Sequence, residues 1–157
     1  RCVLWLEFRR VLFRSNDFAY IQYLNNVKLK PGVVEFLSLL KRMNIKIGLA
    51  TSNSKSLLEV VLKSNGIYHY FDSITLTDEV SRGKNFPDVY LLAAEKLGVK
   101  PAQCVVFEDI LPAVKGAKAA GMKVVGVYDD SSKDQKEDII NNSDMYIIEY
   151  NELTTAI

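Results

Sequence analysis

Short apolar runs alternate with amphipathic segments from Lys30 onward, and this alternation constrains the fold more than any other feature of the chain. The runs are rich in Val and Ile, as buried strands are, and the segments between them have apolar residues at helical spacing and stop at Asn65-Gly66, Gly98 and Gly121. Strands that alternate with helices through short connections predict an α/β fold with a doubly wound parallel sheet, covered by helices on both faces. The expected strands are 45–50, 73–76, 104–107, 123–127 and 144–148, and three of the expected helices are 54–64, 87–97 and 112–120. A fourth helix is expected to start at Lys30-Pro31-Gly32, with Val33, Val34, Leu37 and Leu40 facing inward.

Size and charge limit the classes of partner. The chain has 157 residues, 48% of them hydrophobic and 25% charged, with a formal net charge of +1. This composition is typical of one soluble domain and gives no reason to expect a nucleic-acid or membrane partner. The cysteines Cys2 and Cys104 lie far apart without metal-type spacing, which favours a reducing, cytoplasmic setting.

The residues that follow the first predicted strand favour an anion. Thr51, Ser52 and Asn53 stand between that strand and a helix start. In open parallel sheets, ligands bind outside the carboxyl ends of the strands, and helix N-termini attract phosphate groups. The alternative is ordinary helix capping, which Asn53 or Ser54 could perform alone.

Two carboxylates, Glu108 and Asp109, directly follow the predicted strand 104–107. Oxygen ligands of this kind suit Mg²⁺, which proteins usually hold through one or two carboxylates and substrate phosphate. The alternative is an acidic helix start stabilised by the helix dipole.

Lys84 lies between these motifs, after Gly83 and before the helix-starting Pro87-Asp88. A lysine there can project into the cleft at the strand ends and neutralise a phosphate. The alternative is a solvated loop lysine. Asp88 is interpreted as a helix-start residue that fixes the loop rather than as a ligand.

Taken in chain order, these motifs resemble the second, third and fourth motifs of the haloacid dehalogenase superfamily, in its beta-phosphoglucomutase-like branch. The likeness covers about residues 30 to 150 and includes Ala119-Ala120-Gly121-Met122 after the acidic pair. It implies that Thr51 and Lys84 act in catalysis, that both bind phosphate together with Ser52 and Asn53, and that Glu108 and Asp109 bind Mg²⁺. Where the family commonly has a serine and then a glycine after the acidic pair, this chain has Ile110 and Ala113.

The family's first motif, Asp-x-Asp-Gly, is not found before Thr51. Residues 1–15 contain four of the six arginines, the only tryptophan and none of the lysines, so they are interpreted as a non-native leader. The alternative is a native amphipathic segment. Residues 16–28 are interpreted as the remnant of a helical cap, and 29–157 as the Rossmann-like core, with the central first strand missing or replaced. The run Val3 to Leu6 could stand in for that strand and would place Glu7 where the nucleophile belongs, but with Arg9 at the acid–base position.

The resemblance implies a Mg²⁺-dependent phosphatase or phosphomutase that acts on a small phosphorylated metabolite such as a sugar phosphate, and that is a monomer when complete. Without the nucleophilic aspartate, this chain is expected to be inactive. The alternative is a catalytically dead phosphate-binding or regulatory module. A phospho-acceptor receiver domain is excluded because its acidic residues precede its hydroxyl and lysine, whereas here Thr51 and Lys84 come first.

Overall fold

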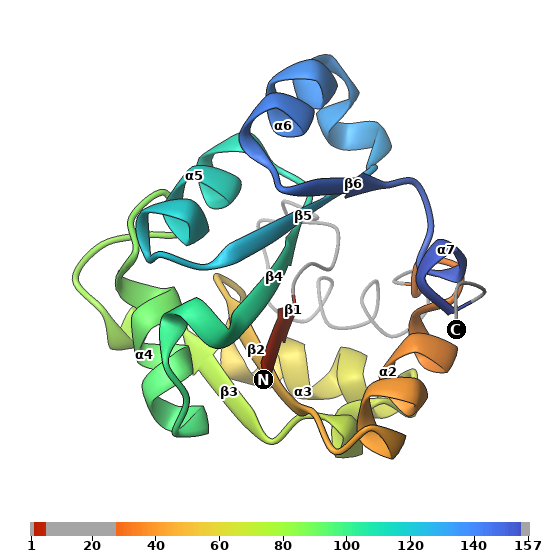
Figure 1. The fold of residues 1–157 in the computed structure, drawn as a ribbon. Helices are drawn as coiled ribbons and strands as arrows, with labels where there is room; N and C mark the ends of the chain where they lie inside the picture. The colour runs from red at the N-terminus through yellow and green to blue at the C-terminus, as the bar shows by residue number, and fades with distance from the viewer. Residues whose placement is uncertain (1, 6–27, 155–157) are drawn as a thin grey trace.

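A parallel sheet of six strands forms the centre of the molecule. The computed structural model describes residues 2–5 and 28–154. The strand order is β3-β2-β1-β4-β5-β6, and every neighbouring pair is parallel (Figure 1). The predicted doubly wound α/β fold is therefore confirmed. The strands are β1 Cys2–Trp5, β2 Lys46–Thr51, β3 Ser73–Leu76, β4 Cys104–Glu108, β5 Lys123–Val127 and β6 Met145–Ile147.

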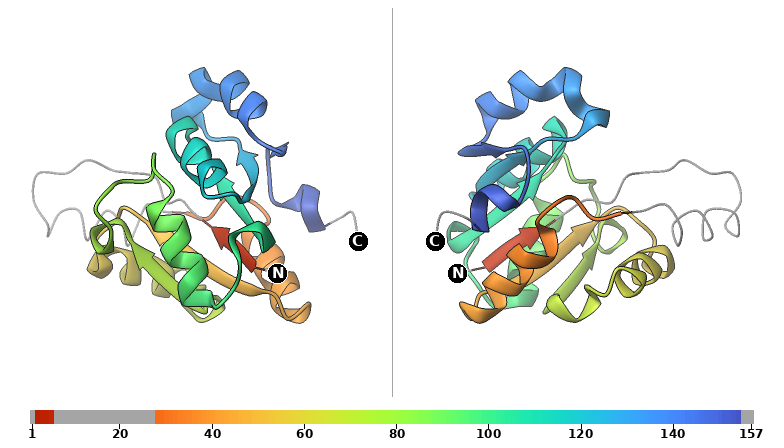
Figure 2. Two further views of the ribbon diagram at one scale, coloured as in Figure 1. Left: turned by 60° about the vertical axis from the view of Figure 1, so that its left-hand side comes forward. Right: turned by 90° about the vertical axis from the view of Figure 1, so that its right-hand side faces the viewer.

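Helices cover both faces of the sheet (Figures 1 and 2). Helices α2, α3 and α7 lie on one face, and α4, α5 and α6 lie on the other, as right-handed crossovers between parallel strands require. The bounds are α2 Val33–Arg42, α3 Lys55–Ser64, α4 Asp88–Leu97, α5 Leu111–Ala119, α6 Lys136–Asn142 and α7 Asn151–Thr154, with 3₁₀ turns at Tyr68–Tyr70, Thr77–Glu79, Pro101–Gln103 and Asp130–Gln135.

Helix α2 begins where Lys30-Pro31-Gly32 predicted, but its buried stripe differs by one residue. Val34 is 41% exposed, whereas Phe36 is buried together with the other predicted positions. Gly32 has a φ of +80°, and a Cβ there would lie 2.4 Å from the backbone nitrogen of Asn151. The glycine therefore lets the start of α2 pack closely against α7.

The central position of the sheet, expected to be missing or replaced, is occupied by β1. Trp5 pairs with Leu49 of β2 on one side and with Phe107 of β4 on the other. This strand comes from the segment interpreted as a leader. The interpretation of residues 1–15 as non-native stays a prediction. The register also places Cys2 opposite Cys104. Their separation along the chain therefore does not argue for a reducing compartment.

The core lies between the sheet and its two helix layers. It is built from aliphatic side chains of β2, β4 and β5 and of the helices over them, with Phe36, Phe107 and Tyr150 in mutual ring contact on the α2 face. Within residues 2–5 and 28–154, no helix is long and apolar enough to cross a membrane.

Candidate active site

The carboxyl edge of the sheet gathers the predicted site residues around the end of β1. Thr51 is the last residue of β2, and Glu108 is the last residue of β4. Because β2 and β4 flank β1, and neighbouring strands lie 4.7–4.9 Å apart, the backbones at Thr51 and Glu108 are about 10 Å apart. β1 lies between β2 and β4, and the resemblance implies a nucleophile in the chain after this strand. Glu7 and Arg9, considered for this position, lie outside the described residues.

Thr51 is buried, with 2% of its surface exposed, and its side chain shapes the turn into α3. Its hydroxyl oxygen accepts a hydrogen bond of 3.1 Å from the backbone nitrogen of Asn53. Ser54 occupies the N-cap position of α3 but makes no side-chain capping bond. Of the two residues considered for ordinary capping, Ser54 is therefore excluded, and the alternative of capping by Asn53 stays open. The turn instead presents Thr51, Ser52 and Asn53 beside the positive end of a ten-residue helix.

Lys84 is buried and forms an ion pair with Glu108. Its Nζ lies 3.0 Å from Oε1 of Glu108, with 7% of the lysine side chain and none of the glutamate side chain exposed. Lys84 therefore projects toward the end of β4, as predicted, and the solvated-loop alternative is wrong, while its role in phosphate binding stays a prediction. Desolvating two charges is costly, so a pair of this kind is weak evidence for stability and a reason to look for a function.

Tyr90, which the sequence did not single out, also contacts Glu108. It is fully buried in α4, and its hydroxyl lies 2.8 Å from Oε1 of Glu108 and 3.1 Å from the backbone oxygen of Ala113. A tyrosine on the apolar face of a helix is typical of a core residue. The only available signal was that a buried phenol needs a hydrogen-bond partner.

The loop that carries Lys84 is held from both ends. Arg82 donates to Oδ1 of Asp88, the first residue of α4, and its guanidinium stacks 4.6 Å from the ring of Phe86. The interpretation of Asp88 as a residue that fixes the loop is thus confirmed. On the inner side, α5 comes so close that a Cβ at Gly116 would lie 2.0 Å from the backbone oxygen of Lys84.

Asp109 follows β4 and is 4% exposed, next to the fully buried Glu108. Two adjacent, buried carboxylates at a strand end are a donor set that fits Mg²⁺, which also retains waters and substrate oxygens as ligands. No group of three or more acidic, histidine or cysteine side chains suited to a metal occurs within the described ranges. The chemistry of the pair therefore fits a magnesium site completed by other ligands.

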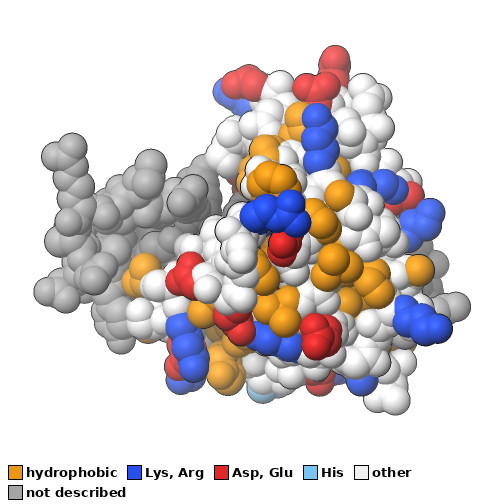
Figure 3. Space-filling view, turned by 90° about the vertical axis from the view of Figure 1, so that its left-hand side faces the viewer, with side chains coloured by type: hydrophobic (Ala, Val, Ile, Leu, Met, Phe, Trp, Pro, Cys, Tyr) orange, Lys and Arg blue, Asp and Glu red, His pale blue; other side chains and the backbone are white. Residues whose placement is uncertain are grey.

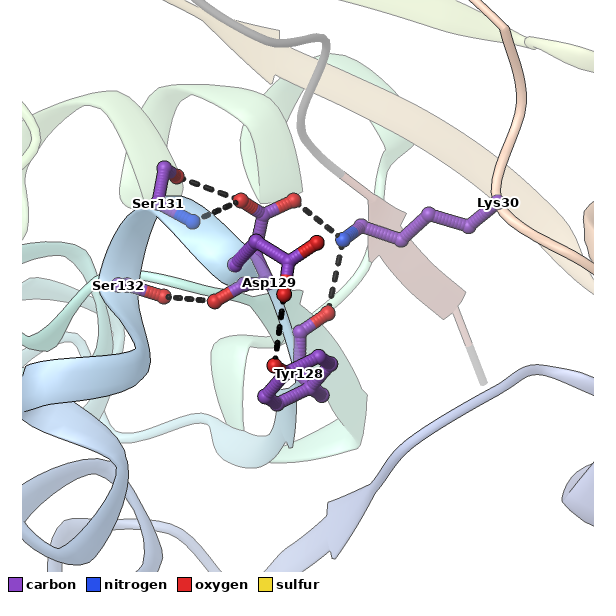
Figure 4. Close-up of polar contacts among 6 residues, drawn as sticks. Lys30, Tyr128, Asp129, Ser131 and Ser132 are labelled. Atoms are coloured by element: carbon purple, nitrogen blue, oxygen red, sulfur yellow. Dashed lines mark hydrogen bonds and ion pairs between the residues drawn. The ribbon is translucent and has the colours of Figure 1, made fainter.

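A second polar cluster lies beyond β5, at the same edge (Figure 4). Lys30 donates to Oδ2 of Asp129 at 2.6 Å and to the backbone oxygen of Tyr128 at 2.8 Å. Burial opposes ionisation of Asp129, but hydrogen bonds from Lys30 and Ser131 outweigh it and lower the pKa of that carboxyl to about 2. Neither Lys30 nor Asp129 was predicted as a site residue, although Asp129 lies just after a predicted strand. It joins the chain before α2 to the end of β5.

Two other surface features lie away from the predicted site residues. The face over α4 and α5 mixes apolar side chains with charges of both signs (Figure 3). An apolar cavity of about 570 Å³ lies on the opposite face, with Phe36, Leu40, Phe107, Val125 and Leu153 among its lining residues. None of the predicted site residues contributes to that cavity.

The chain is similar in sequence to proteins named as a phosphatase and as a phosphoglucomutase. The chain is 41% identical over 81 residues to fructose-1-phosphate phosphatase YqaB of Escherichia coli, covering 52% of this chain and 43% of that protein. It is 38% identical over 123 residues to beta-phosphoglucomutase of Bacillus subtilis, covering 77% of this chain and 54% of that protein. The chain thus spans about half the length of the curated relatives it matches.

Solved structures show the same fold. The crystal structure of CbbY from Rhodobacter sphaeroides in complex with phosphate superposes with a TM-score of 0.79 at 26% identity, covering 87% of this chain and 60% of that one. The family model for haloacid dehalogenase-like hydrolases matches residues 3–121, a range that contains Val3–Trp5 of β1 and every predicted site residue. The chain therefore belongs to the haloacid dehalogenase-like hydrolase family.

Proposed function

We propose that the whole protein is a Mg²⁺-dependent phosphatase or phosphomutase that acts on a small phosphorylated metabolite such as a sugar phosphate. The buried Lys84–Glu108 pair beside Asp109, at the same sheet edge as Thr51, carries this proposal. The names of two relatives support the substrate class, since one is a fructose-1-phosphate phosphatase and the other a beta-phosphoglucomutase.

Each side chain has a distinct task in the proposed reaction. Thr51, Ser52 and Asn53 would bind the transferring phosphoryl group at the N-terminus of α3, where backbone N–H groups and the helix dipole favour negative charge. Lys84 would neutralise a phosphate oxygen as a point charge. Glu108 and Asp109 would hold Mg²⁺, which supplies charge stabilisation to a phosphoryl group during transfer.

The nucleophile is the part of this chemistry that the sequence lacks. No Asp-x-Asp precedes Thr51, and Asp17 is the only aspartate in that stretch. Phosphoryl transfer in this family needs an in-line carboxylate, so we expect the present chain to bind Mg²⁺ and phosphate without turnover. If the protein is instead a catalytically dead phosphate-binding module, this chain should also bind without turnover. A chain with a family-type N-terminus should then still show no turnover.

The experiment has a binding arm and an activity arm. Titration calorimetry with MgCl₂ and with inorganic phosphate should detect both ligands. Lys84→Ala should weaken phosphate binding, and Asp109→Ala should weaken Mg²⁺ binding. The control is Lys63→Ala, whose side chain is 60% exposed on α3, and it should change neither affinity. Absence of binding in the unmodified chain would refute the assigned site.

For activity, residues 1–27 are replaced by the corresponding segment of the Escherichia coli fructose-1-phosphate phosphatase, and a panel of phosphomonoesters is assayed with and without Mg²⁺. Turnover that requires Mg²⁺ supports the enzyme. Binding without turnover in this chimera supports the binding module instead. A monomer in the cytoplasm is part of the same proposal, and size-exclusion chromatography of the chimera tests the oligomeric state.

A further inference from the structure

Tyr90 places a single phenolic proton between two acceptors. Its hydroxyl lies 2.8 Å from Oε1 of Glu108 and 3.1 Å from the backbone oxygen of Ala113 in α5. Hydrogen bonds to an ionised acceptor are shorter and about twice as strong as those between neutral groups. The proton is therefore donated to Glu108, and the contact with Ala113 is secondary.

Oε1 of Glu108 consequently contacts two separate segments, through an ion pair with Lys84 and a hydrogen bond from Tyr90. Lys84 approaches it from the loop before α4, at 3.0 Å, and Tyr90 approaches it from the first half of α4. A glutamate side chain has three rotatable bonds, and an ion pair alone would leave the carboxylate free to turn about them. The hydrogen bond from Tyr90 is directional, so together with the ion pair it fixes the orientation of the carboxylate plane.

We propose that Tyr90 is a positioning residue of the metal and phosphate site, and this rests on the function proposed above. Its hydroxyl fixes the carboxylate of Glu108, and through that carboxylate it fixes the ammonium group of Lys84. The same hydroxyl ties α4 to the end of β4, so the position of Glu108 is set by the helix that follows the Lys84 loop. Partners of this kind orient metal ligands, and their loss typically lowers metal affinity by about 10- to 100-fold.

A structural role for Tyr90 makes a different prediction. If the hydroxyl only satisfies buried groups, its removal lowers the unfolding temperature and leaves ligand affinity unchanged. Tyr90→Phe separates the two roles, because it keeps the buried ring and removes only the donor. Tyr150→Phe is the matched control, since Tyr150 is 1% exposed and packs against Phe36 and Phe107 on the other face of the sheet.

The test is titration of the full chain and both variants with MgCl₂, alongside thermal unfolding. Tyr90→Phe should raise the Kd for Mg²⁺ by about 10-fold, and Tyr150→Phe should leave it within about twofold of the unmodified chain. Equal Mg²⁺ affinity in Tyr90→Phe and the unmodified chain would overturn the inference and leave the proposed function intact. Failure of the unmodified chain to bind Mg²⁺ would refute the metal assignment itself and the inference with it.

A crystal structure of Tyr90→Phe provides a readout that needs no metal. We expect the distance between Nζ of Lys84 and Oε1 of Glu108 to lengthen beyond ion-pair range in this variant, or the Glu108 carboxylate to rotate. An unchanged carboxylate would overturn the inference. If Tyr90→Phe does not fold, the hydroxyl is required for stability, and the positioning role is likewise overturned.

Discussion

Removing the charge of Lys84 should destabilise the fold far more than removing that of a surface lysine. Lys84→Met keeps most of the side-chain volume but leaves Glu108, which is fully buried, without its cation. The bared carboxylate then has to draw in water or take up a proton. Breaking a buried ion pair by removing one partner costs 3–5 kcal/mol, and the remaining bond from Tyr90 places the expected loss near the lower end, at about 3 kcal/mol.

A double-mutant cycle isolates the pair. Glu108→Gln alone should likewise cost about 3 kcal/mol, because it leaves a buried ammonium beside a neutral amide. Lys84→Met with Glu108→Gln should be less destabilised than the sum of the two single variants by about 2 kcal/mol, since no unpaired charge remains. The measurement is urea unfolding at pH 7 with EDTA, so that no divalent cation contributes.

Lys63→Met is the control for the cycle. Its pair with Glu59 is 3.1 Å long and its side chain is 60% exposed, so we expect a change below about 0.5 kcal/mol. A loss below about 1 kcal/mol in Lys84→Met, or additive effects in the double variant, would refute the conclusion that this pair is buried and charged.

Two further predictions concern the same edge, one on stability and one on phosphate affinity. The pKa of Asp129 falls from its ordinary 3.8 to about 2 in the folded protein, so its stabilisation is complete above about pH 4 and is lost as the pH falls through about 2. Asp129→Asn should therefore cost about 2 kcal/mol at pH 7 and almost nothing at pH 2, as read from urea unfolding at both pH values; an equal cost at both would contradict the assignment. Gly116→Ala would bring a Cβ to 2.0 Å from the Lys84 carbonyl, so the loop must shift by more than about 1 Å and phosphate affinity in calorimetry should fall by about 10-fold or more. Unchanged affinity would show that the loop adapts freely.

The architecture could be predicted because the chain's local signals agree with its tertiary structure. Glycines at 66, 98 and 121 end their helices in left-handed conformations, and the β-branched runs became strands to within one residue at most ends. The exception in α2 has a plain cause. Positions 33, 36, 37 and 40 lie on one face at the helical period, whereas Val34 lies off that face. The period therefore predicts burial in this helix better than the hydrophobicity of each residue does.

The predicted site residues were found by their place after strands, and that rule has limits. It located Thr51, Glu108 and Asp109, and it would have located Asp129 had it been applied to β5. It could not locate Tyr90, which lies within a helix and reaches the edge only through its hydroxyl. Nor could it pair β1 with its neighbours, because four apolar residues carry no register information of their own.

The amino edge of the sheet shows what carboxylates do in this fold when they only support it. Asp72 accepts from the backbone nitrogen of Ile47, and Asp144 accepts from that of Val124, so each pairs with the N–H of the second residue of a strand. Burial opposes ionisation of Asp72, but Lys41 and that N–H lower its pKa, while Lys118 and then Val124 lower the pKa of Asp144 to about 2.

Both of these aspartates are partly exposed, at 38% and 27%, and pair with lysines at the surface. At the carboxyl edge, Glu108 has no exposed surface and its cation is buried as well. Solvated aspartates are enough to stabilise the starts of strands in this fold, so stability alone does not require a desolvated lysine–glutamate pair. The desolvation penalty of such a pair can exceed the attraction between its charges. In the function proposed above, the pair is kept for a ligand that replaces the lost water, and the proposed ligand is phosphate with Mg²⁺.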